Sequence, residues 1–406
     1  MVLATCCLLT AASAQWVETV IDLGARVSQV CYNSVNNKAY CVVSGVGLVV
    51  ISGANNEVID SIALDQPVLL SYNARHNKVY CWLRSRDLVV LDGETDSVVT
   101  IVALDHDPCG MFCSETYDKV YCGSDCICNT TSVIDCAADT VLATFYGAAY
   151  FSLSQVQHKV YCTSFWPTVL VLDARSDTVV AEVDVGADLC GGVYVCDREE
   201  KVYCPCSDST VRVVDGRSDT VTVAIQIGME PSSICGDPLG GRAYCGGPDA
   251  RRVAVIDCAG DTILVEAAIP DTAWRLWYSP LSEKVYCLGR NTSVLDCAGD
   301  TVLRRFPGVG AWGVAWNPVW NRMYLAGWDD SVVVLRDSMA GIEERPQPPA
   351  SSSRPGATVA RGLPSGAVVF DAMGRRVVSA KPGVYFVRGE GRGAGDAGRM
   401  RKVVVR

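Results

Sequence analysis

The chain has 406 residues, of which 49% are hydrophobic and 20% are charged. This composition supplies enough apolar side chain for a sizeable core and excludes wholesale disorder. The formal net charge of −10 argues against a nucleic-acid partner, because phosphate contacts need a basic surface.

The N-terminal segment, residues 1–14, is an apolar run that ends in Ala12-Ser13-Ala14, a pattern typical of signal-peptide cleavage. We expect cleavage before Gln15 and export through the periplasm to the outer cell surface or the medium. No Lys or Arg precedes the apolar core, so a buried N-terminal strand is the alternative. The run is shorter than the ~20 residues that cross a bilayer, and no longer apolar stretch follows, so we expect no transmembrane segment.

A short sequence motif of the type Asn-Lys-Val-Tyr-Cys recurs along the chain after this segment. Its tyrosines are spaced by 38 to 42 residues, at Tyr40, Tyr80, Tyr121, Tyr161, Tyr203, Tyr244, Tyr286 and Tyr324. A fixed period near 40 residues indicates a propeller or a solenoid.

The content of one unit separates these two architectures. Between residues 65 and 104 there are four short β-branched or aromatic runs separated by turn residues, and none has the length or period of a helix. Four strands per unit are typical of a propeller blade. The sequence therefore predicts an all-β fold, an eight-bladed β-propeller over residues 15–338, with seven blades as the alternative.

The turn between the third and fourth strands carries an Asp-x-x-x-Asp pattern, as at Asp92 and Asp96. An Asp side chain can accept hydrogen bonds from backbone N–H groups and so fix such a hairpin. Calcium is the alternative, although two recurring carboxylates are fewer than the six to eight oxygens it prefers. We expect no cofactor, with Ca²⁺ as the exception to test.

The eighth unit lacks a fourth strand before the Pro-rich segment. Residues 17–25 read VETVIDLGA and resemble VVAEVDVGA at 179–187, which is a fourth strand and its exit. We therefore predict that the N-terminal strand completes the last blade and closes the ring through backbone hydrogen bonds.

The repeated Lys-Val-Tyr-Cys strand, the following Val-x-Asp strand and the Asp-Thr-Val turn resemble the YVTN-type repeats of YncE-like β-propellers. This resemblance implies a secreted or surface-exposed propeller without an assigned catalytic activity. The sequence departs from that family in placing Cys where a small apolar residue is more usual.

Cysteine is abundant, with 21 residues, and one follows the second-strand tyrosine in seven units. This regularity favours a packing role, because free Cys behaves as a small hydrophobe. If the protein is exported, disulfides within blades become plausible, and we consider Cys31 with Cys41 and Cys235 with Cys245 as candidates. Zinc sites prefer paired Cys-x₂₋₄-Cys modules, so no metal site is assigned.

The C-terminal tail differs from the repeats in composition. It has a Pro/Ser-rich linker at 339–358, and short runs typical of β-strands follow at 359–406. From residue 339 it carries 12 Lys and Arg against 5 Asp and Glu. The runs resemble the C-terminal sorting domain of type IX secretion substrates, with the motif positions Gly374, Arg375, Gly383, Tyr385, Phe386 and Lys402. This resemblance implies that secretion machinery is a partner. A small β-domain that packs on the propeller is the alternative.

No catalytic motif is found, and His106, in Asp-His-Asp-Pro between two blades, is interpreted as a polar turn residue. Propellers bind ligands where loops from all blades converge, so the variable connections between blades are the candidate channel-mouth site. Its residues are Arg26, Asp107, Asp188, Glu230, Trp274, Arg275 and Trp312. We predict a non-enzymatic scaffold for an unknown protein or carbohydrate ligand. The alternative is a hydrolase or lactonase that uses channel carboxylates and a metal.

Overall fold

The structure is a computed structural model that describes residues 15–124, 130–164, 166–238, 240–327 and 329–337, and the backbone of four short strands between 358 and 405. The chain forms two compact units, Met1–Glu343 and Glu344–Arg406. The predicted signal peptide, and the predicted linker up to residue 357, lie outside the described residues. No helix in the described part of the chain is long and apolar enough to span a membrane.

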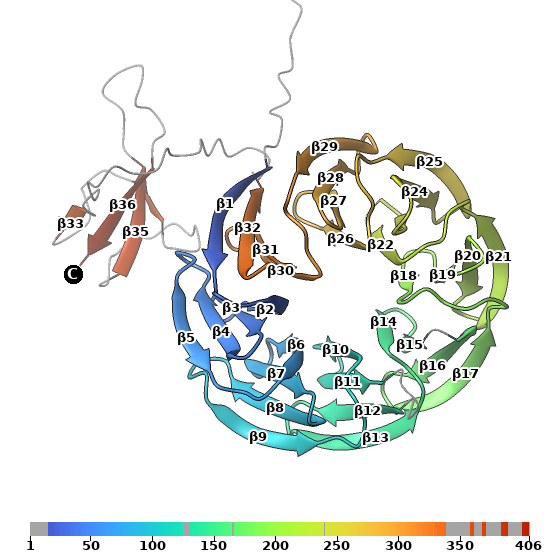
Figure 1. Ribbon diagram of the computed structural model, residues 1–406, viewed down its shortest axis with the longest axis horizontal. Coiled ribbons are helices and arrows are strands. Elements are labelled where there is room, and N and C mark those ends of the chain that lie inside the picture. The colour runs from blue at the N-terminus through green and yellow to red at the C-terminus, as the bar shows by residue number, and fades with distance from the viewer. Residues whose placement is uncertain are drawn as a thin grey trace, which may run out of the picture. The chain divides into compact units, whose positions relative to one another are not determined.

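The first unit contains eight four-stranded antiparallel sheets around a central axis (Figure 1), which confirms the predicted eight-bladed β-propeller and excludes seven blades. Blades 1 to 4 consist of β2 (Val27–Asn33), β3 (Lys38–Val43), β4 (Gly47–Ser52), β5 (Val58–Ile62); β6 (Pro67–Asn73), β7 (Lys78–Leu83), β8 (Asp87–Asp92), β9 (Val98–Ala103); β10 (Gly110–Ser114), β11 (Lys119–Gly123), β12 (Thr130–Asp135), β13 (Thr140–Tyr146); and β14 (Tyr150–Ser154), β15 (Lys159–Thr163), β16 (Thr168–Asp173), β17 (Thr178–Asp184).

Blades 5 to 8 follow the same order until the last, whose fourth strand is β1. They consist of β18 (Tyr194–Cys196), β19 (Lys201–Cys206), β20 (Thr210–Asp215), β21 (Thr220–Gln226); β22 (Ser233–Asp237), β23 (Arg242–Gly246), β24 (Arg252–Asp257), β25 (Thr262–Ala268); β26 (Arg275–Ser279), β27 (Lys284–Leu288), β28 (Thr292–Asp296), β29 (Thr301–Phe306); and β30 (Gly313–Asn317), β31 (Arg322–Ala326), β32 (Ser331–Asp337), β1 (Gln15–Asp22).

The polar residue that precedes each repeated Lys or Arg has a left-handed backbone. Asn37, Asn77 and Asp118, for example, have φ values of 54°, 53° and 58°. Asn, Asp and Gly tolerate this conformation better than other residues, so it accounts for their frequency at this turn. The second Asp of each Asp-x-x-x-Asp turn is left-handed too, as at Asp96 with φ 62°.

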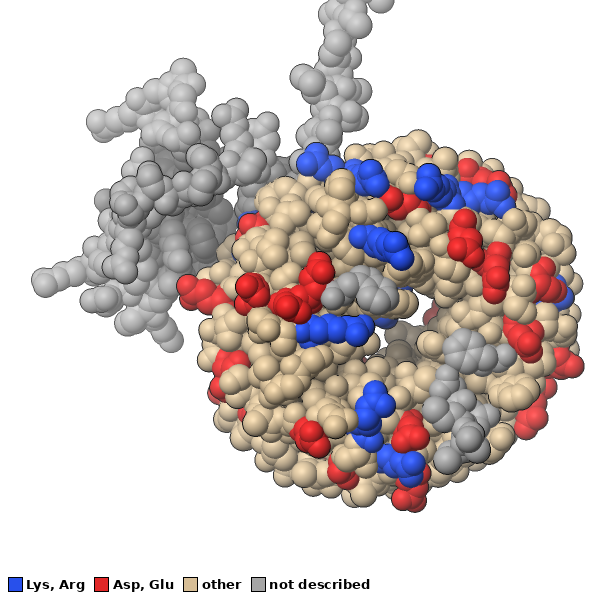
Figure 2. Space-filling model, in the orientation of Figure 1, with Lys and Arg blue, Asp and Glu red and all other residues tan. Residues whose placement is uncertain are grey.

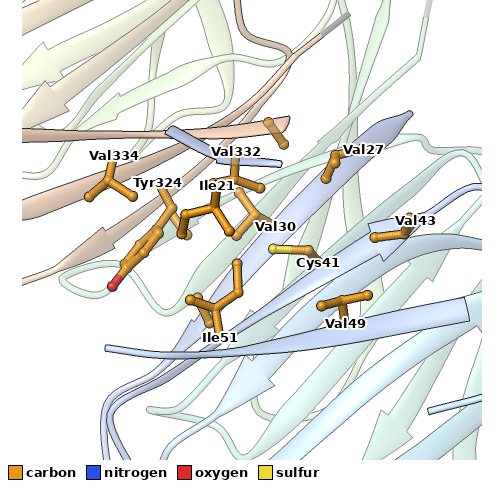
Figure 3. Packing of buried hydrophobic residues seen from close by; sticks show 13 residues of the cluster. Ile21, Val27, Val30, Cys41, Val43, Val49, Ile51, Tyr324, Val332 and Val334 are labelled. Carbon is orange, nitrogen blue, oxygen red and sulfur yellow. The ribbon is translucent and has the colours of Figure 1, made fainter. Parts of the chain in front are cut away.

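The apolar core lies between blades rather than within them. The described buried side chains form eight clusters, and each cluster joins two consecutive blades. Figure 3 shows the cluster between blades 8 and 1, where Ile21 and Tyr324 face Cys41 and Ile51. The second and third strands are therefore buried on both faces, while the outermost fourth strands are largely exposed.

The repeated Tyr-Cys pair divides between two of these clusters. Tyr40 packs against blade 2, whereas Cys41 packs against blade 8, because successive side chains of a strand point to opposite faces. The same division holds in the following blades, so that each tyrosine faces the next blade and each cysteine faces the preceding one. All seven repeated cysteines are at most 2% exposed, which confirms the predicted packing role.

The candidate disulfides within blades are wrong. Cys31 is paired in register with Tyr40, and Cys41 is paired with Val30, so the two thiols point to opposite faces of one sheet. Cys235 and Cys245 have the same offset, since Cys235 is paired with Tyr244. All four residues are free thiols.

The Asp-x-x-x-Asp turn joins neighbouring blades as well as closing its own hairpin. Asp92 Oδ1 accepts the N–H groups of Glu94 and Thr95, as expected for a turn. Asp96 instead accepts from Lys38 Nζ at 2.8 Å and from the Tyr40 hydroxyl, both in the preceding blade. We call this contact between a repeated Lys or Arg and an Asp of the next blade the inter-blade clamp. It recurs from such turns as Lys78–Asp139, Lys119–Asp177, Lys159–Asp219, Lys201–Asp261 and Arg242–Asp300. In blade 8 the acceptor for Lys284 is Asp337, at the end of β32.

The N-terminal strand completes the last blade, as predicted. β1 pairs antiparallel with β32, from Gln15 opposite Asp337 to Asp22 opposite Ser331, and the two strands lie side by side in Figure 1. At the exit of β1, the N–H of Gly24 donates to Asp22 Oδ1 at 2.9 Å; Gly186 and Asp184 repeat this turn at 2.8 Å. The likeness of the two segments in the sequence therefore reflects one shared geometry.

The second unit contains one four-stranded sheet in the order β33 (Thr358–Ala360), β36 (Met400–Val405), β35 (Gly383–Arg388) and β34 (Val368–Phe370). β33 runs parallel to β36, and the other pairs are antiparallel. Gly383, Tyr385 and Phe386 lie in β35, and Lys402 lies in β36. Gly374 and Arg375 fall outside the described residues.

Candidate functional site in the central channel

The first strand of every blade faces the axis, so these eight strands form the wall of a central channel. Figure 2 shows its opening on one face of the ring, with Lys and Arg side chains close to the edge. The cavity in the channel has a volume of about 760 Å³. Its wall is formed by residues from the segments 29–32, 69–72, 109–112, 149–151, 190–193, 232–234, 274–276 and 312–316.

Three tryptophans from blades 7 and 8, namely Trp274, Trp312 and Trp316, lie on one side of this wall, and Trp277 packs against Trp316 without lining the cavity. Trp274 and Trp312 stack with ring centroids 5.5 Å apart and an interplanar angle of 29°. Trp277 and Trp316 lie 6.0 Å apart at 55°. The Trp312 side chain is 40% exposed, so it presents a wide apolar surface to an entering ligand.

Arg275 lies beside this aromatic group and is the only charged residue among the described residues that line the channel. Its Nη1 donates to the backbone oxygen of Trp312 at 2.7 Å, which connects blade 7 to blade 8. The side chain remains accessible to water, but the surrounding walls remove part of its hydration. This desolvation lowers the pKa of Arg275 below its ordinary value.

Three of the seven predicted site residues therefore come together, namely Trp274, Arg275 and Trp312. The other four do not line the channel. Asp107 pairs with Arg86 at 2.9 Å on an exposed surface, and Arg26 and Asp188 lie in exposed connections between blades. Glu230 lies in a separate hollow of about 490 Å³ with Asp249, Arg251 and Arg252.

A further hollow of about 310 Å³ adjoins Trp274 from the surface of the ring. Arg290 and Asp329 contribute its charged groups, and Gly308 and Gly310 leave it open. Neither Arg290 nor Asp329 was predicted as a site residue. Trp274 thus lines both this hollow and the channel cavity.

Sequence reasoning also missed Trp277 and Trp316. Both lie within first strands, at Arg275–Ser279 and Gly313–Asn317, whereas the prediction considered the connections that precede those strands. The signal was available, because the first strand of a propeller blade lines the axis and its alternate residues share a face. Trp316 lines the cavity and is a candidate for contact with a ligand, whereas Trp277 packs against Trp316.

His106, interpreted from the sequence as a polar turn residue, is buried, with 1% of it exposed. It packs edge-on against Trp82 with ring centroids 5.1 Å apart, and its Nε2 lies 2.9 Å from Ser132 Oγ. Burial lowers the pKa of His106, while the neighbouring Asp105 and Asp107 oppose that shift. The residue thus lies within the interface between blades 2 and 3.

The described residues contain no group of three or more His, Cys, Asp or Glu side chains placed to hold a metal ion. The two carboxylates of a turn have separate protein partners, as Asp92 and Asp96 show. The expectation of no cofactor, with Ca²⁺ as the alternative, stays a prediction.

Comparison of the sequence with protein-family models and with curated proteins gives no match. Among solved structures, the propeller is similar to Sqt1 of Saccharomyces cerevisiae with a TM-score of 0.69. The alignment covers 80% of this chain and 99% of that chain, at 9% sequence identity. At this identity the similarity shows the fold, a β-propeller, and nothing further about activity.

Proposed function

We propose that the protein is an exported, non-enzymatic scaffold that binds a ligand at the mouth of its central channel, against Trp274 and Trp312. The resemblance of the repeats to YncE-like propellers supports a surface or secreted location. The resemblance of the tail to type IX sorting domains supports delivery by that machinery. A propeller fold suits a binding role, because rigid blades position loops and first strands around one axis.

The observation that carries the proposal is the group of three tryptophans, Trp274, Trp312 and Trp316, on one side of an otherwise mixed channel wall. Large aromatic side chains supply most of the binding energy at many interfaces and stack well on planar or ring-shaped ligands. The described residues of the wall include no Asp or Glu, so no observation favours the hydrolase or lactonase alternative over binding. That alternative stays a prediction.

The test is a screen of oligosaccharides, small molecules and candidate proteins against the purified protein by thermal shift and titration calorimetry. A ligand of the channel mouth should bind the Trp312→Ala variant about 10 to 100 times more weakly, as expected for loss of a central aromatic contact. Trp166→Ala is the matched control, because Trp166 is 64% exposed and does not line the channel. Ligands that bind all three proteins equally would contradict the proposed site.

A further inference from the structure

The charge of the channel wall carries an inference about the ligand, and this inference rests on the proposed function. Arg275 brings one positive charge into the channel, and the other described residues of the wall are uncharged. The Arg275 side chain donates one hydrogen bond, to the Trp312 backbone oxygen. This bond uses one of the N–H donors of the guanidinium group and does not neutralise its positive charge.

Three other arginines on the described surface are each paired with a carboxylate. Arg86 pairs with Asp107, Arg305 with Asp271, and Arg212 with Asp208. Arg86 lies in a connection, Arg305 in the outer strand β29 and Arg212 in the third strand β20. Each pair has at least one side chain that is more than a third exposed, so water also screens the charges. Arg275 has neither an acidic partner among the described residues nor the full hydration of a surface group.

A partly desolvated cation without a counter-ion is unfavourable, and an anion that enters the channel relieves it. Guanidinium groups bind carboxylates through two parallel, charge-assisted hydrogen bonds in a planar, bidentate geometry. One arginine matches the single charge of a carboxylate. A phosphate, with nearly two charges, would require a second cation in the wall, and the negative net charge of the chain disfavours polyanions.

Trp312 specifies the rest of the ligand, because its backbone oxygen holds Arg275 and its ring is exposed beside it. We propose that the channel binds a carboxylate carried on a ring-bearing molecule, such as an aromatic acid or a uronic acid sugar. The carboxylate contacts Arg275, and the ring lies against Trp312. The channel, at about 760 Å³, has room for a ligand of this size.

The test uses three probes on the full chain: 2-naphthoate, its neutral analogue 2-naphthylmethanol, and acetate. We expect 2-naphthoate to bind at least about tenfold more tightly than 2-naphthylmethanol, and acetate to bind weakly because it has no ring. In Arg275→Gln the affinities of the two naphthyl probes should become equal, while Arg275→Lys should retain part of the difference. Arg84→Gln is the matched control, since Arg84 is exposed in a connection of blade 2 and does not line the channel.

The outcomes separate this inference from the proposed function. Equal affinities for the two naphthyl probes in the native protein, with both weakened by Trp312→Ala, would retain the site and overturn its preference for an anion. An advantage for 2-naphthoate that persists in Arg275→Gln would overturn the role of Arg275. Absence of naphthoate binding would overturn the inferred ligand class, and the proposed function would then depend on the wider screen. Thermal unfolding of each variant establishes that it is folded before binding is compared.

Discussion

Lys284 Nζ lies 2.7 Å from Asp337 Oδ1 and 2.8 Å from Asp337 Oδ2, and both side chains are almost completely buried between blades 7 and 8. The same carboxylate accepts hydrogen bonds from the Tyr286 hydroxyl and from Gln15 Nε2. It therefore joins blade 7, the third strand of blade 8 and the strand β1 that completes blade 8. This is the inter-blade clamp at the place where the ring closes.

Replacement of Asp337 by Ala should strongly destabilise the propeller, because it leaves the Lys284 ammonium buried without a counter-ion. Breaking a buried ion pair by removing one partner typically costs about 3–5 kcal/mol. The measurement is the free energy of unfolding in urea. Asp107→Ala is the control, because its pair with Arg86 is nearly half exposed and is worth at most about 1 kcal/mol. Similar losses in the two variants would contradict the clamp as a major source of stability.

Removal of β1 should open the ring. A chain that begins at Gln15 keeps the full pairing with β32, whereas a chain that begins at Gly24 leaves β32 as an unpaired edge. We expect the first chain to match the full-length protein in thermal unfolding, and the second to unfold at lower temperature and to aggregate. An excess of a synthetic peptide with the sequence of β1 should raise the unfolding temperature of the shorter chain, since it binds only the folded state. If the shorter chain is as stable as the longer one, β1 does not close the ring.

The repeated cysteines should behave as small apolar side chains. Cys81 is fully buried against blade 1, so Cys81→Ala should cost about 1 kcal/mol for the lost volume. Cys81→Ser should cost more, about 2 kcal/mol, because the hydroxyl group is buried in an apolar cluster. Urea unfolding of the two variants measures the difference, and a Ser variant as stable as the Ala variant would contradict the assignment.

Native cysteines should also resist alkylation by iodoacetamide. Burial raises the pKa of Cys31 to about 12 and of Cys287 to about 12, so the reactive thiolate is scarce at neutral pH. We expect mass spectrometry to find these two sites unmodified in the folded protein and modified in urea. Rapid labelling of Cys31 without denaturant would show that the interface between blades 1 and 2 opens readily.

His106 should make the stability of the propeller depend on pH. Burial places its pKa in the folded protein below the ordinary value of 6.5, so the folded state favours the neutral ring. The contribution of His106 to stability is therefore complete above about pH 6.5 and is lost as the pH falls through the lowered pKa. His106→Gln should reduce the change in unfolding free energy between pH 8 and pH 5. Trp166→Ala, which removes no titratable group, should leave that change as it is in the native protein.

The period and the closure of this fold are predictable because they depend on local sequence. The spacing of tyrosines such as Tyr40 and Tyr80 marks the unit, and the turn of Asp22 and Gly24 repeats that of Asp184 and Gly186. The eight blades and their seam follow from these two observations. The residue that a side chain contacts across an interface belongs to the neighbouring blade. The sequence of one unit alone therefore does not predict the contact.

Two errors illustrate this limit. Cys31 and Cys41 lie on paired strands, but their register is offset by one residue, so the two side chains lie on opposite faces of the sheet. Asp96 has a left-handed backbone and reaches Lys38 in the previous blade rather than its own turn. In the candidate site, Trp274, Arg275 and Trp312 were accessible to sequence reasoning because they precede or begin first strands. Trp277 and Trp316 were missed because residues within those strands were not considered.

Each of blades 2 to 7 presents a tyrosine and a basic residue to the blade that follows and an acidic turn to the blade that precedes it. The face that such a blade turns to the next blade is therefore complementary to the face that it turns to the preceding one. A tandem duplication of one forty-residue unit supplies a matched neighbour on both sides, so repeats of this kind can multiply by recombination without new contacts having to evolve. The split blade is the exception, because β1 and the strands β30 to β32 are encoded at opposite ends of the propeller sequence. A change in the way the ring closes must therefore be matched at two distant places in the gene.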